Sequence, residues 1–326
     1  MNAPRFPFLQ QATAIGSVPH TDPQQAVDLV LKELPEAPAW PQLPNRSPLE
    51  HMAPQFAEGI TDATVEGDVV VLPGMPGEHD MPELSAERAP GFFALLEADL
   101  SGIVGLKGQV TGPMTFSRLV QLEGGPAEED LRVCRRLAHL LGRLAEWQEA
   151  MMRRKTRNTL ILVDEPFLAD SLANKRLGSA IAMDFIASTL MWVHGPRGLH
   201  TCAAPNWRFL FNLPLNVLSF DAYTYGESVT EAAKGIRTFL GGGVIAWGIV
   251  PATQAELDKE DADSLMGRLE GIWDKLAAQD VPRAVLERQS MFTPACGLAG
   301  LTPEGAGKAL RLTREIAARV RGSVNS

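Results

Sequence analysis

The chain has 326 residues, of which 45% are hydrophobic and 21% are charged, a composition typical of a globular protein rather than a disordered or fibrous one. The formal net charge of -9 argues against nucleic acid and against an anionic membrane surface as the main partner. No apolar run approaches the roughly 20 residues that cross a bilayer, and residues 1–11 show no secretory signal. Three cysteines, an odd and sparse number, suit a reducing compartment, so we expect a cytoplasmic protein.

Short β-rich runs alternate with longer helical patterns, which is typical of parallel strands joined by crossover helices. The predicted strands are 13–18, 39–43, 103–110, 159–164, 198–202, 217–221, 243–248 and 290–295. The predicted helices are 23–34, 128–156, 179–193, 228–240, 262–278 and 304–321. This alternation predicts an α/β fold, a single (β/α)8 TIM barrel over residues 1–326. An open doubly wound sheet is the alternative, because the second strand is short and flanked by prolines.

The segment from residue 45 to residue 90 is less regular than the rest of the chain. Prolines and glycines surround a β-like run at 68–72. In a barrel we expect such a segment to form an elaborated loop or hairpin near the mouth, where it covers the site.

His200 and Cys202 stand two residues apart at the end of a predicted strand. Side chains on a strand alternate between its faces, so these two point to the same side. Cys296 follows the last predicted strand, and strand ends of a barrel converge on one rim. Three such ligands leave a fourth position open, as in a catalytic zinc site. From spacing alone the alternative is that the buried cysteines are small core residues.

Two carboxylates, Asp164 and Glu165, follow the apolar run of another strand. Asp164 can hold a substrate ammonium group or accept a proton. The alternative is an acidic pair at a helix N-terminus, which the helix dipole favours. Asp221 ends a further strand and allows the same two interpretations, with a possible role as a labile fourth metal ligand.

Gly16 and Ser17 lie in a turn after the first predicted strand. Backbone amides and a hydroxyl in such a turn can bind a carboxylate, although a tight strand exit is the simpler interpretation. The sequence contains no P-loop, no GxGxxG motif and no GxSxG elbow, so nucleotide binding and a serine triad have no support.

In combination these motifs resemble the C-terminal catalytic barrel of cobalamin-independent methionine synthase, in a short form that lacks the family's N-terminal barrel. The same superfamily contains uroporphyrinogen decarboxylase and the zinc corrinoid methyltransferases. The resemblance covers roughly residues 12 to 320, with the motifs in the family's order. The matching residues are Ile15-Gly16-Ser17-x-Pro19, Thr111-Gly112-Pro113-x-Thr115, Asp164-Glu165-Pro166, His200-x-Cys202, Asp221 and Cys296-Gly297-Leu298.

The resemblance implies a zinc ion bound by His200, Cys202 and Cys296. Asp221, a shorter side chain, stands where the family has a glutamate that completes the resting site. Asp221 is therefore expected as a fourth ligand with a catalytic role.

For the substrate, the resemblance implies that Asp164 binds the amino group of homocysteine and is also a catalytic residue. Gly16 and Ser17 belong to the loop that binds the substrate carboxylate. Glu78 matches a second family carboxylate that contacts the same ammonium group.

The implied activity is methyl transfer to a thiol, most simply homocysteine in methionine biosynthesis, with methyl-folate or a methyl-corrinoid protein as donor. Two departures bear on the donor. Residues 246–251 lack the family histidine that is a proposed proton donor, and Ser117-Arg118-Leu119 stands near the position of the folate-binding tryptophan. A corrinoid-dependent methyltransferase for another thiol, such as coenzyme M, and a non-catalytic barrel that binds metal or thiol are the alternatives.

Overall fold

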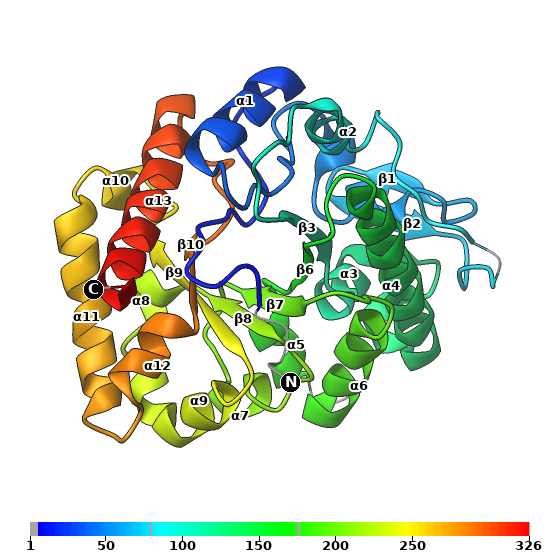
Figure 1. Cartoon of the computed structure of the whole chain (residues 1–326). Helices are drawn as coiled ribbons and strands as arrows, with labels where there is room; N and C mark the ends of the chain where they lie inside the picture. Colours follow the sequence, from blue (N-terminus) through cyan, green and yellow to red (C-terminus); the bar gives the residue numbers. More distant parts are fainter. Residues whose placement is uncertain (1–5, 79, 175–176, 326) are drawn as a thin grey trace.

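The computed structural model describes residues 6–78, 80–174 and 177–325; the other positions of the predicted 1–326 domain lie outside the described residues. One sheet of six parallel strands has the order β10-β9-β8-β7-β6-β3. These strands lie at the centre of the molecule with helices around them (Figure 1). Their bounds are β3 (Leu106–Thr111), β6 (Thr159–Asp164), β7 (Arg197–Thr201), β8 (Val217–Phe220), β9 (Val244–Val250) and β10 (Ser290–Pro294).

The helices agree with the predicted crossover pattern, with boundaries shifted by a few residues. The longer ones are α1 (Pro23–Glu33), α2 (Pro90–Glu97), α4 (Leu131–Arg153), α6 (Gly178–Leu190), α11 (Ala262–Ala277) and α13 (Pro303–Asn325). The shorter ones are α3 (Pro113–Leu119), α5 (Leu168–Ala173), α7 (Trp207–Leu210), α8 (Ala222–Tyr225), α9 (Ala233–Phe239), α10 (Gln254–Leu257) and α12 (Arg283–Arg288). The described residues also form the 3-10 turns η1 (Pro48–Glu50), η2 (Pro54–Ala57), η3 (Ala127–Glu129) and η4 (Ser228–Ala232).

Helix α4 illustrates why these segments are helical. Asp130 caps its first turn by accepting a hydrogen bond from the Arg132 amide. Cys134, Leu137 and Leu141 are buried at three- and four-residue spacing, so one stripe of the helix faces the sheet. The helix predicted over 128–156 is therefore present, and its apolar stripe is the face that packs.

The first two predicted strands, 13–18 and 39–43, are wrong as regular strands. Both segments instead form isolated parallel bridges, through which the chain runs between β10 and β3. The bridges pair Ala12 with Phe292, Ser17 with Gln42 and Ala39 with Lys107. The prediction of an α/β fold with parallel strands is confirmed, and six of the eight strands form a continuous curled sheet.

Prolines explain why the second segment is irregular. Pro38 and Pro41 have no amide hydrogen, so neither can donate to a neighbouring strand. In the first segment, a Cβ atom on Gly16 would overlap the side-chain amides of Gln42 and Gln109. The backbone there approaches its neighbours closely rather than following a ladder.

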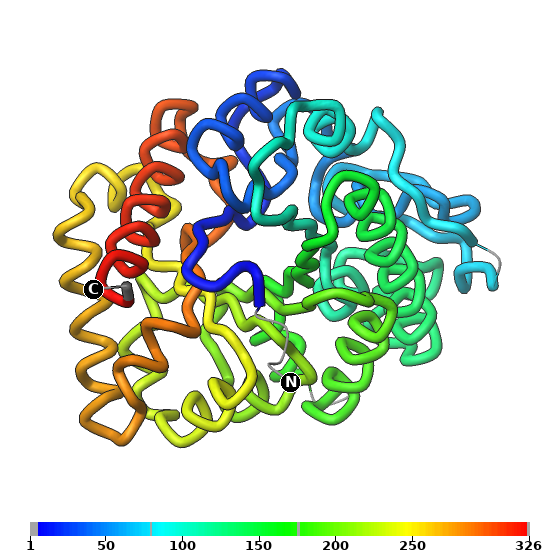
Figure 2. Tube along the Cα trace, in the orientation of Figure 1, coloured from blue at the N-terminus to red at the C-terminus, as the bar shows by residue number. Residues whose placement is uncertain are grey.

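The elaborated segment between residues 45 and 90 contains the hairpin β1 (Thr64–Glu66) and β2 (Val69–Leu72). Its turn uses Gly67 at a φ of 63°, which favours glycine. Strand β2 pairs in parallel with β4 (Val120–Leu122), which pairs with β5 (Gly125–Pro126). This small second sheet lies to one side of the central strands, as the trace in Figure 2 also shows.

The apolar core has two main parts, one between the sheet and the helices and a smaller one in which Phe8 is fully buried. The smaller cluster also contains residues from four central strands, namely Leu160, Leu162, Val217, Val244, Ala246 and Met291. No helix in the described part of the chain is long and apolar enough to cross a membrane.

Candidate active site

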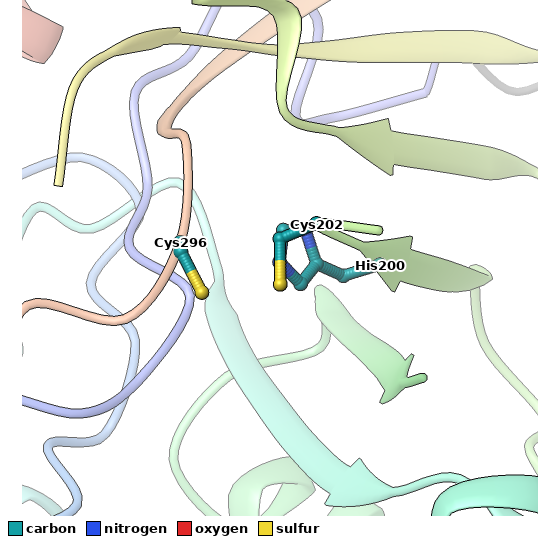
Figure 3. Close-up of side chains that lie close together, drawn as sticks. All are labelled: His200, Cys202 and Cys296. Atoms are coloured by element: carbon teal, nitrogen blue, oxygen red, sulfur yellow. The ribbon is translucent and has the colours of Figure 1, made fainter. Parts of the chain in front are cut away.

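Three side chains with metal-binding atoms meet at the ends of strands β7 and β10. His200 lies near the end of β7, Cys202 follows that strand, and Cys296 follows β10. One ligand atom from each lies within 4.8 Å of the other two. Figure 3 shows the Cys296 sulfur directed across the gap toward His200 and Cys202.

The cluster fits a zinc ion. The Nδ1 atom of His200 lies 2.9 Å from Ser219 Oγ, whereas its buried Nε2 atom has no hydrogen-bond partner among the described residues. In metal sites, the ring nitrogen that does not bind the metal usually forms a hydrogen bond that orients the imidazole. Ligands of tetrahedral zinc stand roughly 3.5–3.8 Å apart, given bond lengths of about 2.0–2.3 Å, so small side-chain rotations close the observed spread.

The two thiols differ in their protonation. A hydrogen bond from Cys202, together with the nearby His200 ring, lowers the pKa of Cys296 to about 4. The same hydrogen bond, and then burial, raises the pKa of Cys202. The two sulfurs therefore share a hydrogen bond, and a cation bound here would take the place of its proton.

The cluster opens into a cavity of about 430 Å³. Asp164, which is 9% exposed, lies in its wall, and its Oδ1 atom has no hydrogen-bond partner in the described structure. Burial raises the pKa of Asp164 to about 6, and the charges of Lys107 and His200 oppose this effect. A buried carboxylate oxygen without a partner is suited to a cationic ligand group.

Ser17 also lines the cavity, next to the segment that carries Cys296. The carbonyl of Ser17 accepts a hydrogen bond of 2.8 Å from the Leu298 amide. A Cβ atom on Gly297 would overlap the Ser17 hydroxyl, so glycine is required at this approach. Gly16, in the same turn, lies directly against the side-chain amides of Gln42 and Gln109.

Two other predicted site residues lie outside the ligand group. Asp221 caps α8 by accepting a hydrogen bond of 2.8 Å from the Thr224 amide, and its atoms are not part of the 4.8 Å cluster. Burial raises its pKa, and the Cys296 thiolate and His200 charges also act on it, so it lies in the same electrostatic environment.

Glu78 does not reach the cavity. Its side chain is 77% exposed and forms an ion pair with Arg136 on α4 at 2.9 Å. The structure therefore does not bring Glu78 near Asp164, and the reason is that the segment after β2 turns outward along α4. The buried carboxylate that this loop region contributes to the cavity is Glu50 instead.

Two buried titratable side chains, Lys107 and Glu165, lie next to the site. Lys107 is fully buried and donates to the Ile15 carbonyl and, at 3.0 Å, to Gln109 Oε1. Burial lowers the pKa of Lys107 to about 8, which the Asp164 carboxylate opposes. Glu165 accepts hydrogen bonds from the Thr115 amide and hydroxyl, so it anchors the start of α3.

The polar side chains of Glu50, His51 and Asp68 also line the cavity, and no motif in the sequence points to them. They come from η1 and the β1–β2 turn, where no periodic pattern exists to align them with strand ends. Their only sequence signal is the clustering of prolines and glycines that predicts a loop over the mouth.

No protein-family model and no curated protein sequence matches this chain. Among solved structures, a B12-independent methionine synthase from Shewanella sp. W3-18-1 in complex with selenomethionine has a TM-score of 0.69 and 14% identity, covering 97% of this chain and 99% of that one. A putative vitamin-B12 independent methionine synthase from Listeria monocytogenes has a TM-score of 0.62 and 16% identity, covering 92% of this chain and 86% of that one. A methyltransferase from Methanosarcina mazei has a TM-score of 0.52 and 16% identity, covering 94% of this chain and 87% of that one. Over nearly its whole length, this chain therefore shares its fold with B12-independent methionine synthases and a methyltransferase.

Proposed function

We propose that this protein is a zinc-dependent methyltransferase that transfers a methyl group to the thiol of homocysteine, giving methionine. The observation that carries the proposal is the convergence of His200, Cys202 and Cys296 within 4.8 Å at one end of a cavity that also contains Asp164. The shared fold with methionine synthases supports it. The proposal includes one eight-stranded barrel domain over residues 1–326, in which the two bridged segments complete the ring.

The ligand set favours zinc over harder cations, because two of its three ligands are soft thiolates. Three protein ligands leave a fourth tetrahedral position for a substrate. When bound, zinc would supply a Lewis acid that keeps a coordinated thiol deprotonated and nucleophilic at neutral pH.

The residues of the chain itself would bind and orient the amino acid. In this proposal the free Asp164 oxygen accepts hydrogen bonds from the substrate ammonium group, a charge-assisted contact. The Ser17 hydroxyl and the backbone of its turn bind the substrate carboxylate. Apolar side chains of the cavity, including Leu119 and Phe167, exclude water around the reacting sulfur.

Asp164 also discriminates between candidate thiols. Coenzyme M has a thiol and a sulfonate but no ammonium group, so it would leave the buried carboxylate without a partner. The acidic cavity wall therefore favours an amino-acid thiol over that alternative. The methyl donor, methyl-folate or a methyl-corrinoid protein, is the part of the proposal that turnover must decide.

The test is turnover by the purified, zinc-loaded protein. Homocysteine is supplied with methylcobalamin or with methyl-tetrahydrofolate, and methionine is measured by mass spectrometry. We expect methionine with one donor and none after zinc is removed by a chelator. Tight binding of zinc and homocysteine without turnover of either donor would favour the non-catalytic alternative, and a protein that binds no zinc would contradict the proposal.

A further inference from the structure

His51 lines the same cavity as the ligand cluster and contacts two different segments of its wall. Its Nδ1 atom is hydrogen-bonded to Asp68, in the turn of the β1–β2 hairpin. Its Nε2 atom lies 3.1 Å from the carbonyl oxygen of Pro44, which follows the bridged segment 39–42. All three residues are part of the cavity lining, so the ring joins the hairpin to the rim of the central sheet.

The chemistry of the two partners fixes the protonation of the ring. A carbonyl oxygen such as that of Pro44 can only accept, so Nε2 must donate. The carboxylate oxygen of Asp68, whose side chain is 72% exposed, accepts as well. Neutral imidazole has one N–H, and only the imidazolium form has two.

We propose that His51 is a positioning residue: as an imidazolium it clamps the β1–β2 hairpin to the cavity rim through Asp68 and Pro44. Loss of the ring proton would leave two acceptor atoms facing each other in one of these contacts. Because that arrangement is repulsive, either the hairpin turn or the Pro44 loop must then separate from the ring. The cavity wall loosens as a result.

Among the described residues, other hydrogen bonds hold the loop, whereas the Asp68 side chain is hydrogen-bonded to His51 alone. The Met52 carbonyl accepts a hydrogen bond of 2.7 Å from Thr111 at the end of β3. Glu50 accepts one of 3.2 Å from the Leu43 amide. Loss of the clamp should therefore affect the turn around Asp68 most.

The charged groups around the ring come from three parts of the molecule. On its own loop, Glu50 is paired with Arg46. The hairpin contributes Asp68, and the strand ends contribute Asp164 and His200 to the same cavity.

The clamp can be measured without turnover, by amide hydrogen exchange and by nitrogen NMR of histidine-labelled protein. We expect the His51 signal, assigned from His51→Gln, to show two protonated nitrogens wherever the hairpin of the wild type is protected. His51→Gln and Asp68→Asn should each raise exchange in residues 64–72 by about tenfold. Glu66→Gln, an exposed change on β1, serves as the matched control, and Asp68→Glu, which keeps a carboxylate, should retain protection.

The pH dependence supplies a second, independent readout. Exchange in the hairpin should rise at the same pH at which the His51 signal changes to a single protonated nitrogen. A neutral ring in a fully protected hairpin, or unchanged exchange in both clamp variants, would overturn the proposal. Both variants alter exposed or half-exposed side chains, so a thermal melt can establish that the fold is retained.

The consequence for catalysis rests on the proposed methyl transfer. In that reaction the clamp variants should raise KM for homocysteine about tenfold while kcat stays within about twofold. The reason is that the bound substrate and its transition state lose the same interactions, so the chemical step is unaffected. If the protein shows no methyl transfer at all, the exchange and NMR results still decide whether the clamp exists. A lowered kcat with unchanged KM would contradict a positioning role.

Discussion

The cavity has two walls built on different principles. One wall consists of side chains at strand ends, namely Asp164, His200 and Cys296, each fixed by a strand that is buried nearly throughout. The other consists of Glu50, His51 and Asp68, held by hydrogen bonds between loops. The first wall is set by the sheet, while the second depends on charges that a change of pH or of one residue can alter.

The largest effect is expected at the strand-end wall, from replacing either ligand cysteine. Cys202→Ser and Cys296→Ser should each weaken zinc binding more than about 100-fold. Replacing a residue that only hydrogen-bonds to a metal ligand already lowers metal affinity about 10–100-fold. Methyl transfer should disappear in parallel. Metal content after dialysis, measured by mass spectrometry, tests this.

Cys134 provides the matched control for those variants. It is buried on α4 and its thiol donates to the Ala127 carbonyl, outside the cavity lining. Cys134→Ser should keep its zinc. Full zinc retention in both ligand variants would remove the metal site from this account.

The next effect separates substrate binding from metal binding on the same wall. Asp164→Asn should keep zinc but weaken homocysteine binding about 10–100-fold, as expected for a lost charge-assisted contact. Titration calorimetry measures both. Glu78→Gln, which alters an exposed ion pair, should change neither by more than about twofold. An equal loss in the two variants would contradict the assignment of Asp164.

A smaller effect concerns the pH dependence of stability. Burial raises the pKa of Glu165 to about 7 in the folded chain, above the ordinary value of 4.5. Between these pH values the folded chain binds a proton that the unfolded chain has lost. The free energy of unfolding should therefore fall with rising pH, by up to about 1.4 kcal/mol per pH unit from this group.

Denaturant unfolding of Glu165→Gln between pH 4.5 and 7 measures that contribution. The variant should show a flatter pH dependence than the wild type. An unchanged slope would mean that the buried carboxyl near α3 does not titrate in this window.

The smallest effect is expected for Asp221→Asn. Asparagine can still cap α8, and the native carboxylate lies outside the ligand cluster. Zinc affinity should change less than about tenfold in a competition titration. A loss as large as that of the cysteine variants would make Asp221 a full member of the metal site.

The strand-end wall could be predicted because period-two alternation and barrel topology bring distant residues such as His200 and Cys296 to one rim. The first two segments could not be predicted correctly, since Gly16 approaches Gln42 too closely for a regular strand, and Pro38 and Pro41 interrupt the ladder of the second segment. The loop wall could not be predicted either. No periodicity relates Asp68 to His51, and no pattern in the sequence indicates that Glu50 lines the cavity while Glu78 pairs with Arg136 at the surface.

The central claim is that two sulfurs and one imidazole hold a zinc ion with an open position. Zinc-edge X-ray absorption of the wild-type protein, with and without homocysteine, tests it most directly. The account predicts two sulfur ligands at about 2.3 Å in the free protein and three when homocysteine is bound. A metal shell without sulfur, or one that homocysteine leaves unchanged, would contradict it.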